Sequence, residues 1–206
     1  MEKLWKVADK VAVSTDDKRI ADAVQDLAIV IPRPAEYSVQ TNLVAGILTH
    51  ALHYLMSDGG YTPDIILHMT PCTPLVSVKM LQLLVDTLIS GPAYKRVDLI
   101  YPCSVCAQKL VRIEHDRIMP YIKDDPYRGA RQLHEQAYMP VWVFARWYEE
   151  TLLKYDRVGE DVIYPMDGFV IGEPGTHVDV DSEEDMKTAE KLWTLQQNKD
   201  CPNENR

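Results

Sequence analysis

Short apolar, β-branched runs alternate along this chain with segments of helical length, and this alternation constrains the fold more than any other feature. A strand-like run at 10–14 precedes a helical segment at 16–27, and a helical segment at 41–57 precedes a strand-like run at 64–69. The same pattern repeats once more, at 75–90 and 97–102. Strands joined by crossover helices are typical of a mostly parallel α/β sheet. We therefore predict such a sheet, flanked by helices.

The second half of the chain departs from this alternation before returning to it. Residues 111–122 predict two short strands around an Asp-containing turn, followed by a polar stretch with Arg131 and Gln132. A strand, a helix, a final strand and a final helix are then predicted, at 139–145, 146–155, 176–180 and 182–197. No linker divides the chain. We expect a single domain, 1–206, with a small β-hairpin excursion at about 111–140.

Charge and hydropathy exclude two classes of partner. The chain has 206 residues, 46% of them hydrophobic, with 22 basic and 31 acidic side chains and a net charge of -9. A long-range field that would attract nucleic acid or an anionic membrane is therefore absent. No window approaches the roughly 20 apolar residues of a membrane span, and the first ten residues lack the apolar core of a signal peptide. We expect a cytoplasmic protein.

The four cysteines do not form the pattern of a disulfide framework. They are expected to be reduced thiols, and they stand at Cys72, Cys103, Cys106 and Cys201. Cys103 and Cys106 have Cys-x-x-Cys spacing, but a structural zinc site needs two further ligands and no second pair exists. Ordinary strand or loop residues are the favoured interpretation, against zinc or redox chemistry.

An acidic run, HVDVDSEED at 177–185, admits two interpretations. Ser182 and Asp185 have capping-box spacing, and acidic residues stabilise the start of a helix, so 182–185 has a structural explanation. Asp179 and Asp181 precede the helix and share one face if 176–180 is a strand. Two such carboxylates repel unless a cation or donors lie between them, so Mg²⁺ binding competes with a solvated strand end.

Three stretches, 11–52, 64–81 and 178–190, together resemble the acylneuraminate cytidylyltransferases, which make CMP-sialic acid, and their relatives that activate other acidic sugars. The resemblance runs from about Lys10 to Leu195. It implies a Rossmann-like sheet, a homodimer formed through the excursion, and attack of a sugar hydroxyl on the α-phosphate of CTP with release of pyrophosphate. It also implies a catalytic metal, Mg²⁺ or Mn²⁺, held by Asp179 and Asp181.

The resemblance assigns further roles residue by residue. Arg33, before Pro-Ala-Glu, matches an arginine associated with the nucleotide, and Asn42 lies in the adjoining nucleotide segment. Thr70 stands where the family has a sugar-binding glutamine, and Val76 where it has an arginine, which implies altered sugar recognition. Arg33 as a strand-edge residue fixed by prolines remains the structural alternative.

Two further segments carry substrate contacts by the same resemblance. Lys109 corresponds to a basic residue near the sugar, although the histidine that precedes it in the family is missing. Arg131 and Gln132 match an Arg-Gln pair that reaches the partner subunit's sugar site. For Arg131, an ordinary surface arginine is the alternative.

The family's glycine-rich, basic, triphosphate-cradling loop has no counterpart among the 9 glycines. We therefore expect weak CTP turnover from this chain. Three hypotheses follow: a cytidylyltransferase without its N-terminal piece, a non-catalytic relative that acts as a binding or assembly partner, and a nucleotidyltransferase for a different sugar acid.

Overall fold

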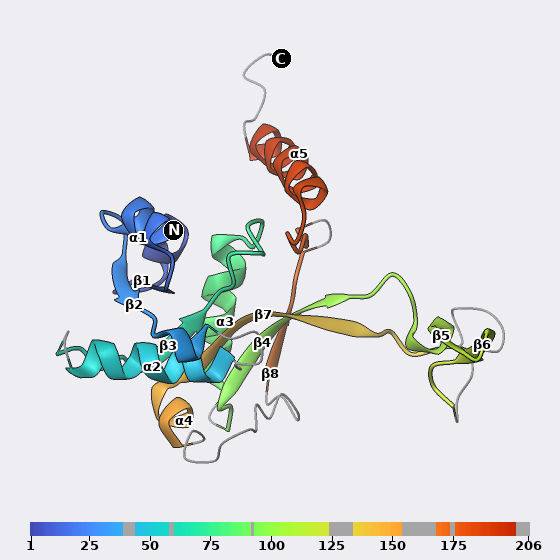
Figure 1. Cartoon of the computed structure of the whole chain (residues 1–206), viewed down its shortest axis with the longest axis horizontal. Helices are drawn as coiled ribbons and strands as arrows, with labels where there is room; N and C mark the ends of the chain where they lie inside the picture. The colour runs from blue at the N-terminus through green and yellow to red at the C-terminus, as the bar shows by residue number, and fades with distance from the viewer. Residues whose placement is uncertain are drawn as a thin grey trace.

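A four-stranded sheet forms the centre of the molecule. The computed structural model describes residues 1–38, 44–57, 60–91, 93–123, 134–153, 168–173 and 176–200. The strands, in spatial order, are β3 (Ile65–His68), β7 (Tyr138–Trp147), β4 (Arg96–Pro102) and β8 (Gly168–Ile171). Strand β7 is antiparallel to β3 and β4, whereas β8 is parallel to β4. Three of the four strands therefore run in one direction, which confirms the predicted α/β class (Figure 1).

A smaller parallel pair of strands stands beside this sheet. Strands β1 (Ala12–Thr15) and β2 (Ile29–Pro32) are joined by helix α1 (Lys18–Val24), which lies within the helical segment predicted at 16–27, whereas β2 itself is not among the predicted strands. The 3₁₀ turn η1 (Leu4–Lys6) connects this pair to the main sheet. Trp5 Nε1 donates to the Leu27 carbonyl at 2.7 Å, while Leu4 packs against the main core. A second 3₁₀ turn, η2 (Ala35–Tyr37), follows β2.

Helix α3 (Val78–Ser90) covers one face of the main sheet. Ser77 caps it by accepting the Met80 N–H at 3.2 Å. Its apolar side consists of residues at helical spacing that are almost fully buried, namely Met80, Leu81, Leu84 and Leu88. They meet the alternate strand residues Val97, Leu99, Val143 and Ala145. Burying each leucine contributes about 1.5–3 kcal/mol, so this interface is the main hydrophobic core.

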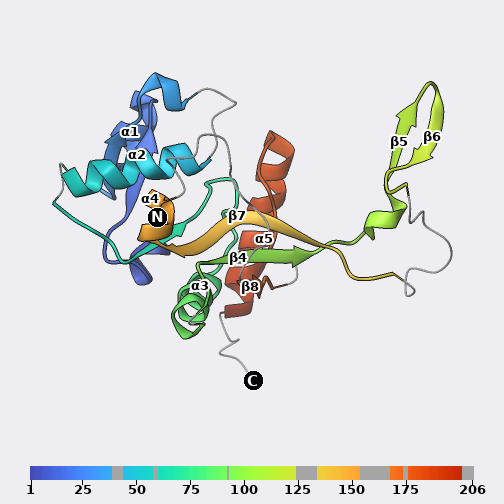
Figure 2. The ribbon, with the colours of Figure 1, turned by 90° about the horizontal axis from the view of Figure 1, so that it is seen from below.

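Helices α2 (Val44–Ser57) and α4 (Tyr148–Leu153) contact each other on the opposite side of the strands from α3 (Figure 2). Helix α5 (Glu183–Asp200) ends the described chain. Among the described helices, none is long and apolar enough to cross a membrane.

The sheet face opposite α3 buries charge. Arg96 Nε donates to Asp98 Oδ2 at 2.7 Å, a second guanidinium nitrogen contacts Oδ1, and Asp98 is 1% exposed. The Arg96 guanidinium also lies 3.8 Å from the centre of the Phe144 ring, on which His68 stacks. A paired and hydrogen-bonded carboxylate is the form in which buried charge is tolerated. Burial nevertheless raises the pKa of the Asp98 carboxyl. The hydrogen bond from Arg96 acts in the opposite direction and is the smaller effect.

The predicted hairpin is present and lies at the opposite end of the molecule from β1 and β2 (Figures 1 and 2). It follows the 3₁₀ turn η3 (Ala107–Lys109) and consists of β5 (Val111–Glu114) and β6 (Arg117–Pro120). The two turn residues, His115 and Asp116, have φ of 49° and 60°, as in the turns that match the twist of a two-residue hairpin.

Two sequence predictions are corrected. Residues 176–180 are not a strand, because Val180 donates its backbone N–H to a loop carbonyl, that of Cys72, rather than to a strand. The final strand is instead β8, a short segment that pattern alone did not single out. The helix predicted from Arg146 begins at Tyr148, since Arg146 and Trp147 still pair with β3.

The half-buried His68 predicts an acid-dependent loss of stability. Its Nδ1 donates to the Trp142 carbonyl at 2.8 Å, and burial lowers the pKa of His68 to about 4. Below pH about 6.5 the unfolded chain protonates this imidazole whereas the folded chain does not, so unfolding becomes easier as pH falls towards 4. The contribution between pH 7 and pH 5 is about 2 kcal/mol.

Urea unfolding at pH 7 and pH 5 measures this effect. We expect His68→Asn to reduce the stability difference between the two pH values by about 2 kcal/mol. The exposed His53, changed to Asn, is the matched control and should leave the difference unchanged. An unaltered pH dependence in His68→Asn would contradict the assignment.

Candidate functional site

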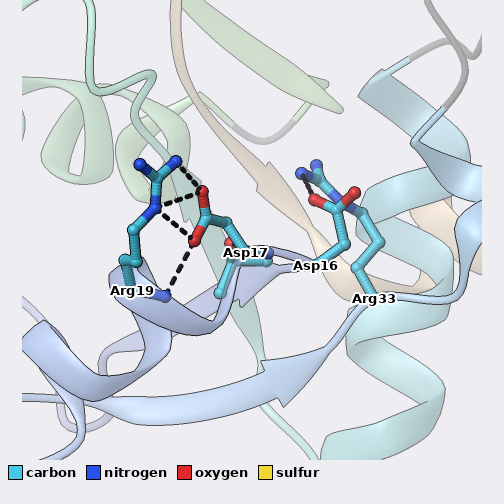
Figure 3. Close-up of polar contacts among 5 residues, drawn as sticks. Asp16, Asp17, Arg19 and Arg33 are labelled. Carbon is cyan, nitrogen blue, oxygen red and sulfur yellow. Dashed lines mark hydrogen bonds and ion pairs between the residues drawn. The ribbon is translucent and has the colours of Figure 1, made fainter.

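Polar residues follow the carboxyl ends of strands β1 and β2. Thr15 and Pro32 are register partners at the end of this parallel pair, so the next residues, Asp16 and Arg33, emerge side by side. The Arg33 guanidinium donates to Asp16 Oδ1 at 3.0 Å (Figure 3). This bond, followed by one from Ser38, lowers the pKa of the Asp16 carboxyl. A basic group is therefore held at a position where parallel α/β sheets bind ligands.

The neighbouring Asp17 has a structural role. It accepts the Arg19 backbone N–H at 2.7 Å and thereby caps α1, and the Arg19 side chain folds back onto the same carboxylate (Figure 3). These contacts lower the pKa of Asp17. Figure 3 shows two separate Arg–Asp pairs, of which only Asp16–Arg33 joins the ends of both strands.

The loop after β3 is built around Thr70. Its carbonyl accepts the Thr73 hydroxyl at 3.0 Å, and its own hydroxyl accepts the Cys72 N–H at 3.4 Å. From the other side, Lys3 Nζ donates to the carbonyls of Pro74 and Val76 at 2.8 and 3.0 Å. Burial lowers the pKa of Lys3. The loop is thus shaped by its own threonines and by a lysine about 70 residues away.

The segment after β8 crosses the end of β4 towards this loop. The Gly172 N–H donates to the Ile100 carbonyl at 2.8 Å, and a Cβ on Gly172 would overlap the Tyr101 ring. The Tyr101 hydroxyl and Thr176 Oγ1 are 2.8 Å apart, and the His177 ring stacks on the Tyr101 ring. Tyr101 therefore contacts this segment where it crosses the carboxyl edge of the sheet.

At the end of this crossing, three potential metal ligands converge. The Val180 N–H donates to the Cys72 carbonyl at 2.9 Å. Asp179 and Asp181, on either side of Val180, are exposed, and Cys72 is half-buried. One ligand atom from each of Cys72, Asp179 and Asp181 lies within 4.8 Å of the others. Within the described ranges, no other set of three His, Cys, Asp or Glu residues meets that condition.

The rest of the acidic run starts helix α5. Ser182 Oγ accepts the Asp185 N–H at 3.3 Å, while Asp185 Oδ2 accepts the Ser182 N–H at 2.9 Å. This reciprocal capping box is the one that the spacing predicts. The hydrogen bond from the Ser182 hydroxyl is the main cause that lowers the pKa of Asp185. The run thus divides into a helix cap and a separate carboxylate pair.

The predicted site residues fall into three groups. Asp179 and Asp181 are brought to the loop that holds Thr70, whereas Arg33 lies at the end of β2 and Lys109 ends η3, ahead of the hairpin. Val76, at the expected arginine position, is 1% exposed and belongs to the α3 core. Asn42, Arg131 and Gln132 lie outside the described residues, so their predicted roles stay predictions.

Several residues that shape the site were not singled out from the sequence. The sequence marks Cys72 only as one of four reduced thiols, although its place in the predicted sugar loop is a usable signal. Asp16 lay in the resembling stretch without an assigned role. Lys3, Tyr101 and Thr176 carried no signal, because their contacts join distant parts of the chain.

Three solved structures share this arrangement of strands and helices. No protein-family model matches the sequence, and no curated protein sequence matches it. A structure of CMP:2-keto-3-deoxy-manno-octonic acid synthetase complexed with CTP has a TM-score of 0.63 and 16% identity, over 96% of this chain and 86% of that chain.

The other two structures are 4-diphosphocytidyl-2C-methyl-D-erythritol synthases, each 12% identical over 93% of this chain. One has a TM-score of 0.66 and is covered over 86% of its length. The other, from Anaerococcus prevotii, has a TM-score of 0.58 and is covered over 83% of its length. Identities this low establish the fold alone: the chain has the mixed α/β fold of these three proteins.

Proposed function

We propose that this protein transfers a cytidylyl group from CTP to a hydroxyl group of an acidic sugar, releasing pyrophosphate. The observation that carries the proposal is the convergence of Asp179 and Asp181 on the loop after β3, at the carboxyl edge of the sheet. The same fold occurs in a synthetase that was solved with CTP. Carboxylates at this edge suit a metal that contacts phosphate oxygens.

The reaction is a displacement at phosphorus. The sugar hydroxyl oxygen bonds to the α-phosphorus, the bond from that phosphorus to the bridging oxygen breaks, pyrophosphate leaves, and the hydroxyl proton passes to water. Catalysis of this kind depends on positioning and charge neutralisation. A divalent ion, Mg²⁺ or Mn²⁺, held by Asp179 and Asp181 would supply positive charge to the phosphate oxygens. Arg33 would contact the nucleotide.

The acceptor is an acidic sugar of a class related to the N-acylneuraminates, and the loop favours one other than N-acylneuraminate itself. Val76 is buried in the α3 core and offers no charge to a carboxylate. The Thr70 hydroxyl already accepts a backbone N–H within its own loop. The same two observations support a second candidate, a relative that binds CTP as a partner protein without transferring it.

Pyrophosphate release tests the transfer. We expect release that requires CTP, a divalent ion and one member of a panel of sugar acids, including N-acylneuraminate and 2-keto-3-deoxy-octonate. Asp179→Asn/Asp181→Asn should lower the rate at least about 100-fold, because a bound metal supplies several kcal/mol of charge stabilisation in the transition state.

Glu183→Gln/Glu184→Gln is the matched control, because it removes two exposed carboxylates next to the site, in the first turn of α5. It should stay close to the wild-type rate. CTP binding without release for any acceptor would favour the binding partner, and the absence of both would refute a nucleotide function.

The Asp16–Arg33 pair predicts a nucleotide contact. Arg33→Gln should weaken CTP binding at least about tenfold, as expected for a lost charge-assisted hydrogen bond to phosphate. Arg19→Gln removes an equally charged residue that pairs with the adjacent Asp17, and it should leave binding within about twofold. Calorimetric titration with CTP measures both variants. Equal losses of CTP affinity in the two variants would show that the effect comes from the change in net charge and not from a contact of Arg33.

We also propose a homodimer formed through the hairpin. Ile113 and Ile118 are register partners on β5 and β6 and are 77% and 75% exposed, an unusual degree for isoleucine. We further propose a cytoplasmic location, as expected from the sequence.

Charged substitutions on the hairpin test whether the dimer forms through it. Light scattering should give the mass of two chains for the wild type and of one chain for Ile113→Glu/Ile118→Glu. Ile89→Glu, on the exposed side of α3, is the control for adding charge at an exposed isoleucine and should stay dimeric. A wild-type mass of one chain would overturn the proposal.

A further inference from the structure

We propose that Cys72 is a third ligand of the metal site, and that the site therefore binds a borderline transition ion such as Zn²⁺ or Co²⁺ in preference to Mg²⁺. The inference rests on the proposed function, because it concerns the same ion. It goes beyond that function by naming a ligand and a metal preference.

The geometry places the thiol with the carboxylates. The ligand atoms of Cys72, Asp179 and Asp181 lie within 4.8 Å of one another. Zinc–sulfur and zinc–oxygen bonds of about 2.3 and 2.0–2.2 Å span at most about 4.5 Å between two ligand atoms. Small side-chain rotations therefore suffice to bring all three onto one ion.

The backbone holds this arrangement together. A 2.9 Å hydrogen bond between main-chain atoms joins Cys72 and Val180. This bond uses none of the three ligand side chains. Thr70 orients the loop by accepting the Cys72 N–H, and Lys3 holds the carbonyls of Pro74 and Val76. The thiol thus comes from a loop that is tied at both ends.

The chemistry of the ligand set decides the metal. Mg²⁺ takes oxygen ligands and keeps its waters, so a sulfur atom adds little to its binding. Thiolate ligands favour zinc and related transition ions, while carboxylates also accept Mn²⁺. One sulfur atom and two carboxylates are a mixed set, which suits ions between these extremes.

Cobalt binding tests the ligand directly, because a thiolate bound to Co²⁺ gives a charge-transfer absorption band in the near ultraviolet. We expect the 206-residue chain, reduced and kept without oxygen, to develop this band on titration with CoCl₂. The band should be absent in Cys72→Ser and unchanged in Cys103→Ser, a second half-buried free thiol. Urea unfolding of Cys72→Ser confirms that the fold is retained.

Calorimetric titration measures the preference of the site for Zn²⁺ over Mg²⁺. Cys72→Ser should weaken Zn²⁺ binding at least about tenfold and leave Mg²⁺ binding within about twofold, since even the loss of a group that only supports a ligand costs 10–100-fold. Asp179→Asn/Asp181→Asn should weaken the binding of both Zn²⁺ and Mg²⁺.

The outcomes separate this inference from the proposed function. Co²⁺ binding that is lost in Asp179→Asn/Asp181→Asn, but gives no thiolate band in the wild type, overturns the role of Cys72 and leaves the carboxylate site standing. A band that persists in Cys72→Ser also overturns that role. If the wild type binds none of these ions, both the inference and the metal of the proposed function fail.

Discussion

The hydrogen bond from the Val180 N–H to the Cys72 carbonyl, at 2.9 Å, is the contact on which the candidate site depends. It joins the loop after β3 to the segment after β8, although these strands form opposite edges of the main sheet. The crossing is possible because Tyr101 stacks on His177 and meets the Thr176 hydroxyl. Gly172 admits the Tyr101 ring because it lacks a Cβ. Two carboxylates and a thiol converge as a result.

The two faces of the main sheet have different chemistry. The face against α3 is apolar and provides the hydrophobic core. The opposite face buries the Arg96–Asp98 pair beside Phe144 and His68. Buried ion pairs contribute little net stability, but the loss of one partner leaves an uncompensated charge. Arg96 and Asp98 both belong to β4, and the Arg96–Phe144 and Phe144–His68 ring contacts link this pair to β7 and β3 on the same face.

Local sequence patterns predicted much of the fold. The Ser182–Asp185 capping box, the turn at His115–Asp116 and the alternation of strands and helices depend on neighbouring residues, and each is present. The strand predicted at 176–180 was wrong because apolar–polar alternation describes an extended segment without showing whether a neighbouring strand is available. The short strand β8 was overlooked for the same reason: its pairing partner, β4, lies about 70 residues earlier.

The sequence by itself determined that Asp179 and Asp181 stand apart from the helix cap that follows them, and that Thr70 comes directly after a strand-forming run. These are consequences of spacing along the chain. Only the tertiary structure decided that Cys72 joins the two aspartates, that Asp16 holds Arg33, and that Val76 is buried in the core. The reason is physical: each of these relations is a contact between segments separated in sequence, set by strand order and loop crossing rather than by local preference.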